Sequence, residues 1–129
     1  MKKLRKKIKV TLEKTRMGYS AYAEDLNVFT TAPHVDLLTK NLVEAINLYY
    51  EDKGCFVDHD NLSLHLDIPQ FFGFYRVLNA KYLARRIGMN PVLLSQYVTG
   101  RKVPSHRQAM KIVEGIHNIG KELSGLKLE

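Results

Sequence analysis

The chain has 129 residues, of which 45% are hydrophobic and 26% charged, and its formal net charge is +7. A chain of this length and composition forms one ordinary domain or two small ones with a buried core, which excludes wholesale disorder. The single cysteine, Cys55, excludes an internal disulfide framework and is typical of a protein of the reducing cytosol.

The charge is unevenly distributed along the chain. Residues 1–10 hold six basic and no acidic side chains, residues 11–70 hold four basic and ten acidic ones, and residues 71–129 hold ten basic and three acidic ones. Two basic blocks of +6 and +7 therefore flank an acidic block of −6. This distribution predicts one surface for a polyanion and another for a cationic partner, with ordinary solvated faces as the alternative.

The N-terminal segment is strongly basic but does not continue into an apolar run. In MKKLRKKIKVTLEK the apolar residues alternate with polar ones, so the continuous apolar region of a signal peptide is missing. No segment approaches the roughly 18–20 apolar residues that span a bilayer. We therefore expect a cytoplasmic protein with no membrane contact, in which the basic segment binds DNA, an acidic protein or nothing.

The first half of the chain alternates with a period of two. The stretch IKVTLE predicts a strand, a turn containing Gly18 follows, and YSAYA and NVFTT predict two more strands. Apolar residues at three- and four-residue steps from Val35 to Tyr49 predict an amphipathic helix, and LSLHLDI predicts a fourth strand. The order predicts an α+β domain over residues 1–68, with a small antiparallel sheet and one helix on one face.

The hydrophobic period then becomes helical, and residues 69–129 predict an all-α domain of four or five helices. The aromatic stretch PQFFGFYRVL predicts the first of these. Three further helices are indicated by their N-terminal caps: Asn79, Asn90 followed by Pro91, and the S-x-x-Q capping box that begins at Ser105.

Two of these helices meet at a short turn with a suitable residue at each special position. Gly88 can take the left-handed conformation that ends the first helix, and Ala84 is small where the second helix crosses it. Leu94 and Tyr97 supply apolar contacts to a shared core. The stretch NAKYLARRIGMNPVLLSQYVTGRKVPSHRQAMKIVEGI, residues 79–116, resembles the helix-turn-helix of the Xre/phage-repressor family.

That resemblance implies that Pro91–Thr99 is a recognition helix that enters the major groove of DNA. The residues that it turns toward base edges are Asn90, Pro91, Val92, Ser95 and Gln96. Gln96 is the best candidate for base readout because an amide pairs bidentately with adenine, although it also fits a plain exposed side chain. Pro91 departs from the polar residue that is common in the family. The residues expected near phosphates are Asn79, Lys81, Arg101 and Lys102.

The first half resembles the HicB-type antitoxin domain, a reduced RNase H-like ββ(β)αβ fold. The resemblance covers residues 7–68 and rests on IKVTLEK, on the turn glycine Gly18, on YSAYAEDL and on LLTKNLVEAINLYY. The chain departs from the family at DLNV, residues 25–28, where Pro-Gly is usual.

In the HicB family the partner is a small basic HicA-like RNase toxin. The antitoxin masks this toxin and represses their shared operon through its DNA-binding part. The resemblance therefore implies a non-enzymatic antitoxin that binds a toxin and operator DNA as a homodimer or higher oligomer. The carboxylates expected to contact the toxin, unless they are merely solvated, are Glu13, Glu24, Asp25 and Asp36. The alternative is a stand-alone helix-turn-helix transcriptional regulator whose sheet domain binds a ligand or mediates oligomerisation.

The acidic residues also raise an enzymatic hypothesis. A two-metal nuclease needs several carboxylates that converge on ions about 3.5–4 Å apart, but the first two predicted strands offer apolar or hydroxyl residues at the inward positions. Asp58–Asp60 with His65 is a conceivable metal set, although such clusters in polar loops are more often plain loop. We therefore expect no catalytic residue, no metal and no cofactor.

Overall fold

The computed structural model describes residues 1–128 and divides the chain into two compact units, the first over Met1–Phe74 and the second from Tyr75 onward. The fold is of the α+β type, as the sequence predicts. The division falls after residue 74, later than the predicted boundary at residue 68, because the helix that follows the sheet packs against it.

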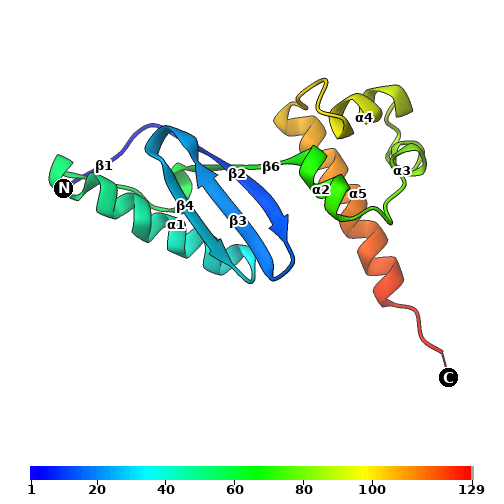
Figure 1. Cartoon of the computed structure of the whole chain (residues 1–129), viewed down its shortest axis with the longest axis horizontal. Helices are drawn as coiled ribbons and strands as arrows, with labels where there is room; N and C mark the ends of the chain where they lie inside the picture. The colour runs from blue at the N-terminus through cyan, green and yellow to red at the C-terminus, as the bar shows by residue number, and fades with distance from the viewer. Residues whose placement is uncertain (129) are drawn as a thin grey trace. The chain divides into compact units, whose positions relative to one another are not determined.

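The first unit contains a four-stranded sheet, a two-stranded sheet and two α-helices among its described residues (Figure 1). Its strands are β1 (Lys2–Lys3), β2 (Ile8–Thr15), β3 (Gly18–Ala23), β4 (Val28–Ala32), β5 (Cys55–Phe56) and β6 (Leu62–Leu66). Its helices are α1 (Val35–Tyr50) and α2 (Ile68–Phe74), with 3-10 turns η1 (Glu24–Leu26), η2 (Glu51–Lys53) and η3 (His59–Asn61).

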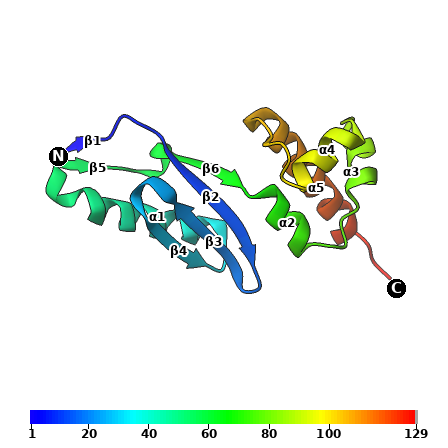
Figure 2. The ribbon, with the colours of Figure 1, turned by 45° about the horizontal axis from the view of Figure 1, so that its top comes forward.

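The larger sheet is mixed, which corrects the predicted antiparallel sheet. Its strand order is β4-β3-β2-β6, and β2, β3 and β4 are antiparallel neighbours. However, β6 runs parallel to β2, with Ile8 opposite Leu62 and Leu12 opposite Leu66 (Figure 2). The reason is the crossover: α1 carries the chain back along the sheet, so the strand after it points the same way as the strand before it.

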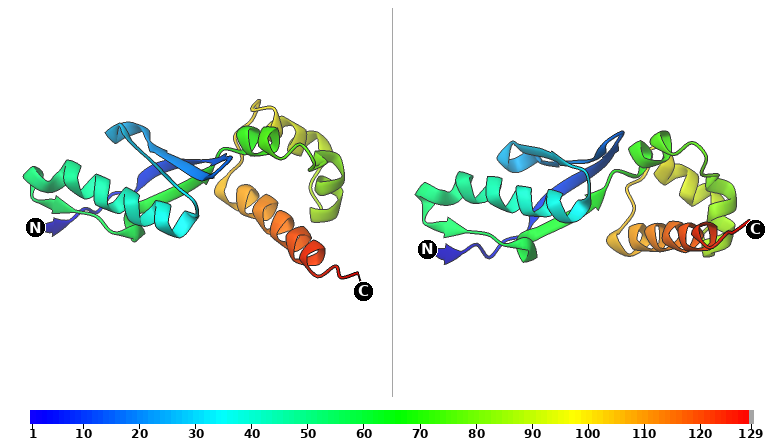
Figure 3. Two further views of the ribbon diagram at one scale, coloured as in Figure 1. Left: turned by 60° about the horizontal axis from the view of Figure 1, so that its bottom comes forward. Right: turned by 90° about the horizontal axis from the view of Figure 1, so that it is seen from below.

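Helix α1 covers one face of this sheet and closes the core of the first unit (Figure 3). Leu38, Leu42 and Ile46 recur at four-residue steps along the helix and are fully buried. They pack with the inward residues of the strands, among them Ile8, Val10, Leu12, Ala21 and Ala23. The polar residues that alternate with them along β2 face away from the helix.

Helix α2 is attached to the sheet by a side-chain amide that bonds β2 as the backbone of a neighbouring strand would. The amide of Gln70 accepts a hydrogen bond from the backbone N of Lys14 at 2.8 Å and donates one to its carbonyl at 2.7 Å. These two bonds continue the ladder where β6 ends. The predicted helix over PQFFGFYRVL is correspondingly shorter and ends at Phe74.

The basic N-terminal segment is folded onto the first unit. Strand β1 pairs in parallel with β5, and both were missed by the sequence analysis because two residues show no period (Figure 2). The buried side chain of Asn61 donates hydrogen bonds to the carbonyls of Leu4, at 2.7 Å, and Lys6, at 3.1 Å. Backbone pairing and this amide therefore hold the segment in place.

The second unit consists of α3 (Ala80–Ile87), α4 (Pro91–Val98) and α5 (His106–Ser124). The side chains that form its buried centre are Leu83, Ala84, Met89, Leu94, Tyr97 and Ile112. Among the described residues, no helix has the length and apolar character needed to cross a membrane.

Helices α3 and α5 cross closely at Gly115. A Cβ at this position would lie 2.3 Å from Cγ2 of Ile87 and 3.5 Å from Cδ1 of Leu83. The first distance is shorter than van der Waals contact, so the crossing requires a residue without a side chain at this position. It fixes α3, and through the following turn α4, against α5.

We expect Gly115→Ala to destabilise the second unit by about 1–3 kcal/mol, because the new methyl group overpacks the crossing. The matched control is Gly120→Ala on the same helix, where a Cβ would meet nothing within 4 Å. This control should be neutral or stabilising by up to about 1 kcal/mol, since alanine favours helix. Thermal and urea unfolding of the full chain, followed by circular dichroism at 222 nm, measures both. Equal stability of the two variants would contradict the close crossing.

Candidate nucleic-acid and partner surfaces

The turn between α3 and α4 is fixed by capping interactions. Oδ1 of Asn79 accepts a hydrogen bond from the backbone N of Tyr82 at 3.1 Å, and Oδ1 of Asn90 accepts one from that of Val92 at 2.8 Å. Gly88 ends α3 in the left-handed region with φ of 70°, and the backbone N of Met89 donates to the carbonyl of Ala84 at 2.8 Å. The predicted caps therefore form, and they set the direction of α4.

Helix α4 has one buried side and one side that faces solvent. Leu94 and Tyr97 are buried in the centre of the unit. Of the five predicted base-facing residues, Asn90, Val92 and Ser95 are exposed, whereas Pro91 and Gln96 are half-buried. Asn90 is the N-cap of α4 and the other four lie within the helix, so the structure places all five on one short segment.

The predicted phosphate-contacting residues lie at the two ends of this arrangement. Asn79 and Lys81 are exposed at the start of α3, and Arg101 and Lys102 are exposed in the turn that follows α4. The turn begins at Gly100, whose φ of 81° redirects the chain. Lys102 is anchored there by a hydrogen bond from its backbone N to the carbonyl of Gln96, at 3.2 Å.

Two arginines in the last turn of α3 were not among the predicted site residues. Arg85 is exposed, and its guanidinium lies 5.4 Å from the ring centre of Tyr82, which restricts its motion. Arg86 instead forms an ion pair with Glu122 of α5. Arg85 therefore offers an additional exposed cation. Its position one helical turn after Lys81 was the signal in the sequence that could have identified it.

These features match the requirements of DNA recognition. A helix with its side chains is about 10–12 Å wide, close to the width of the B-DNA major groove. Amide, hydroxyl and methyl groups can read base edges, while exposed cations on flanking turns contact phosphates. The exposed side of α4 provides the first kind of group and the two flanking turns provide the second.

The predicted toxin-contacting carboxylates do not form one cluster. Glu13 lies on β2, opposite Ser20. Glu24 and Asp25 follow the end of β3 that pairs with the start of β4, whereas Asp36 follows the end of β4. These carboxylates are exposed, but they are divided between the two ends of the β3-β4 ladder.

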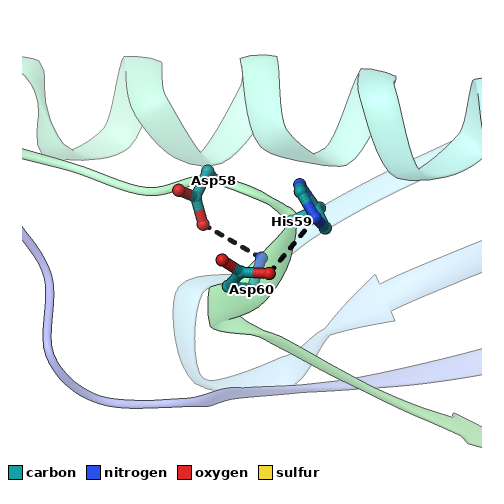
Figure 4. A group of neighbouring side chains, drawn as sticks. All are labelled: Asp58, His59 and Asp60. Carbon is teal, nitrogen blue, oxygen red and sulfur yellow. Dashed lines mark hydrogen bonds and ion pairs between the residues drawn. The ribbon is translucent and has the colours of Figure 1, made fainter.

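Asp58, His59 and Asp60 form a compact acidic cluster at the start of η3 (Figure 4). Their potential ligand atoms lie within 4.8 Å of one another. His65, which belonged to the conceivable metal set, is hydrogen-bonded to Ser63 instead, with its Nε2 3.0 Å from the hydroxyl.

The carboxylates of this cluster are already engaged by groups of the same chain. Oδ1 of Asp58 accepts a hydrogen bond from the backbone N of Asp60, and Nε2 of His59 lies 3.1 Å from a carboxylate oxygen of Asp60. The ammonium of Lys3 lies 3.0 Å from Asp58 and 3.6 Å from Asp60. A metal ion at this position would have to displace Lys3, so the cluster serves as a clamp for the N-terminal segment.

The clamp shifts the pKa of both partners. The hydrogen bond from Lys3 lowers the pKa of Asp58 below its ordinary value of 3.8, and the same bond raises the pKa of Lys3 above 10.5. The stabilising effect of Asp58 is therefore present above about pH 3.8 and is lost as the pH falls through its folded pKa. That of Lys3 is present below about pH 10.5 and is lost as the pH rises through its folded pKa.

We expect Lys3→Gln to raise the pKa of Asp58, because the substitution removes the ammonium that stabilises the carboxylate. Titration of the side-chain carboxyl carbon by NMR between pH 2 and pH 6 measures this pKa. The charge-matched control is Lys9→Gln, an exposed residue of β2 that makes none of these contacts. A titration of Asp58 that is the same in both variants would contradict the clamp.

Function is inferred from the geometry and charges of this chain's own residues. Comparison of the chain with known protein families, with curated proteins and with solved structures finds no match. The features of the chain that bear on function are the capped turn between α3 and α4, the exposed side of α4 and the uneven distribution of charge.

Proposed function

We propose that the chain is a HicB-like antitoxin with a C-terminal Xre-type helix-turn-helix. In this proposal α3 and α4 form the motif that binds operator DNA and represses the chain's own operon. The first unit, with its reduced RNase H-like order of elements, binds and neutralises a small basic RNase toxin. Such a protein acts in the cytoplasm and has no catalytic residue of its own.

The observation that carries the DNA-binding part is the capped turn with the exposed side of α4. The caps at Asn79 and Asn90 and the left-handed Gly88 hold α4 at a fixed angle. The buried Leu94 and Tyr97 then leave the opposite side of the helix free. A pre-formed helix of this kind enters a groove with little loss of backbone conformational freedom, which supports the proposal.

The side chains on that face favour a limited base code. Gln96 can pair with adenine, and the methyl groups of Val92, whose side chain is 66% exposed, can contact a thymine methyl. Pro91 carries no donor, so the tip of the helix adds little readout. Most of the affinity then comes from phosphate contacts of exposed cations such as Arg85 and Arg101.

In the proposed complex, the two-fold symmetry of a dimer supplies the rest of the specificity for the operator. One helix-turn-helix covers only a half-site, and two copies related by a two-fold axis place two recognition helices about one helical turn of DNA apart. We therefore propose a homodimer, or a higher homo-oligomer, on a palindromic operator.

The antitoxin part rests on charge and on the resemblance of the first half to the HicB-type domain. Residues 11–70 carry −6, which attracts a cationic protein and accelerates its association. The basic residues of the N-terminal segment offset part of this charge locally, because Lys3 is paired with Asp58.

We expect Gln96→Ala to weaken binding to the operator by about 1–3 kcal/mol, with little effect on random DNA, because the amide reads a base. Arg101→Ala should weaken binding to the operator and to random DNA alike, because it removes a phosphate contact. It should also reduce the slope of the logarithm of the binding constant against the logarithm of the salt concentration by about one unit. Fluorescence anisotropy with a duplex from upstream of the operon and a scrambled duplex, at several salt concentrations, measures both effects.

The matched control for Arg101→Ala is Arg16→Ala, which removes the same side chain from the exposed turn after β2 in the first unit and should leave DNA binding unchanged. Equal losses on operator and scrambled DNA for Gln96→Ala would contradict its role in base readout. Absence of any DNA binding by the wild-type chain would overturn the DNA-binding proposal.

The antitoxin part is tested with the product of an adjacent reading frame that encodes a small basic protein. Expression of that product alone should arrest growth, and co-expression of this chain should restore it through a complex that co-purifies. The Gln96→Ala and Arg101→Ala variants should still restore growth when the toxin is expressed from an independent promoter. If the purified pair never associates, the antitoxin part fails while the DNA-binding part stands.

A further inference from the structure

A groove runs along α1 beside the segment Cys55–Asp60 of the first unit. It consists of two hollows, with volumes of about 590 and 440 Å³, and Glu44 lines both of them. Neither the predicted DNA-contacting residues nor Glu13, Glu24 and Asp25 line these hollows. Of the residues with a predicted DNA or toxin contact, only Asp36 lines the groove.

The floor of the groove is apolar and open to solvent. Leu48 of α1 is 71% exposed, and Phe56 of β5 is 36% exposed on the opposite wall. Val43 is half-buried in the adjoining hollow. Large apolar side chains that share one groove, rimmed by polar residues, are typical of a site that another molecule covers.

The walls of the groove are held in fixed positions. The amide of Asn47 on α1 accepts a hydrogen bond from the backbone N of Val57 at 2.7 Å and donates one to its carbonyl at 3.1 Å. Val57 itself is buried in the core. The helix and the opposite segment are therefore tied together, and a ligand meets a pre-formed site.

The rim of the groove carries a row of carboxylates at a helical spacing. Asp36, Glu44 and Glu51 follow one another at steps of eight and seven residues, and all three line the groove. Such steps amount to about two helical turns, so Asp36 and Glu44 of α1 and Glu51, which directly follows its last residue, lie along one side of the helix roughly 11 Å apart. Lys40 of α1 also lines the groove, as does Met1 at the start of the basic N-terminal segment.

We propose that this groove is the docking site for a basic amphipathic helix of a partner protein. Apolar side chains of that helix would cover Leu48 and Phe56, and its lysines or arginines would pair with Glu44 and Glu51. The proposal rests on the antitoxin function proposed above, since it states where and by which chemistry the cationic partner binds.

The charges disfavour a second copy of this chain as the occupant. A two-fold contact through the groove would bring the α1 of each copy against the other, and with it the carboxylates of Glu44 and Glu51 from both copies. Like charges in such an interface cost free energy, whereas a cationic helix gains it.

The test uses the full-length chain and a fluorescein-labelled helical peptide of leucine and lysine, about 18 residues long to match α1. Anisotropy measures its dissociation constant for the wild type, for Glu44→Lys/Glu51→Lys and for Leu48→Ser. We expect the double variant to bind at least about tenfold more weakly and Leu48→Ser to bind several-fold more weakly. The control Glu114→Lys/Glu122→Lys makes the same charge change on α5, outside the groove, and should shift binding less than about twofold.

Equal weakening by the two charge-reversal variants, or by neither, would overturn the groove as the site. A wild-type dimer in sedimentation velocity that dissociates on Leu48→Ser would assign the groove to a second copy and also overturn the proposal. Circular dichroism of each variant verifies that it is folded.

The two proposals fail separately in a growth-rescue assay. If Glu44→Lys/Glu51→Lys binds the peptide poorly but restores growth as well as the wild type, the toxin docks elsewhere and the groove assignment fails. If the wild type binds the peptide through the groove but never associates with the adjacent gene product, the antitoxin function fails and the groove remains a site for another basic helix.

Discussion

The presentation of α4 depends on the close contact between α3 and α5 at Gly115. A side chain at this position would collide with Ile87, so only glycine allows α3 to approach. Once α3 is fixed, the left-handed backbone at Gly88 and the cap at Asn90 determine the direction in which α4 runs. Burial of Leu94 then determines which side of the helix faces solvent. The proposed DNA-reading surface is thus a consequence of packing on its opposite side.

In the first unit, packing on one side of α1 likewise leaves its other side exposed. Its core uses only one side of α1, and the amide pair between Asn47 and Val57 holds the neighbouring segment beside the helix. This leaves the exposed side chain of Leu48 in the same hollow as Glu44 and Glu51. Three of the ten acidic residues in the block 11–70, namely Asp36, Glu44 and Glu51, are therefore aligned along α1 and its C-terminal end, where they can meet a cationic partner.

The sequence predicted those elements whose signals are local. Alternation identified the four strands of the main sheet, and the caps at Asn79 and Asn90 located the starts of α3 and α4. The orientation of β6 was missed, because alternation is the same in both directions along a strand. The late unit boundary and the docked N-terminal segment depend on Gln70 and Asn61, whose partners lie more than fifty positions away in the chain. The carboxylate row of the groove required the structure, because charge counts do not show which side chains share a wall.

In the proposed function, this chain contacts DNA through the exposed side of α4. An NMR titration of the ¹⁵N-labelled full-length chain with a duplex from upstream of its operon tests this contact. We expect the largest amide shifts at the start of α4 and at the turns at Asn79 and Arg101, with the strands of the first unit unchanged. Shifts concentrated in the first unit, or no shifts at a DNA concentration that saturates the anisotropy signal, would contradict it.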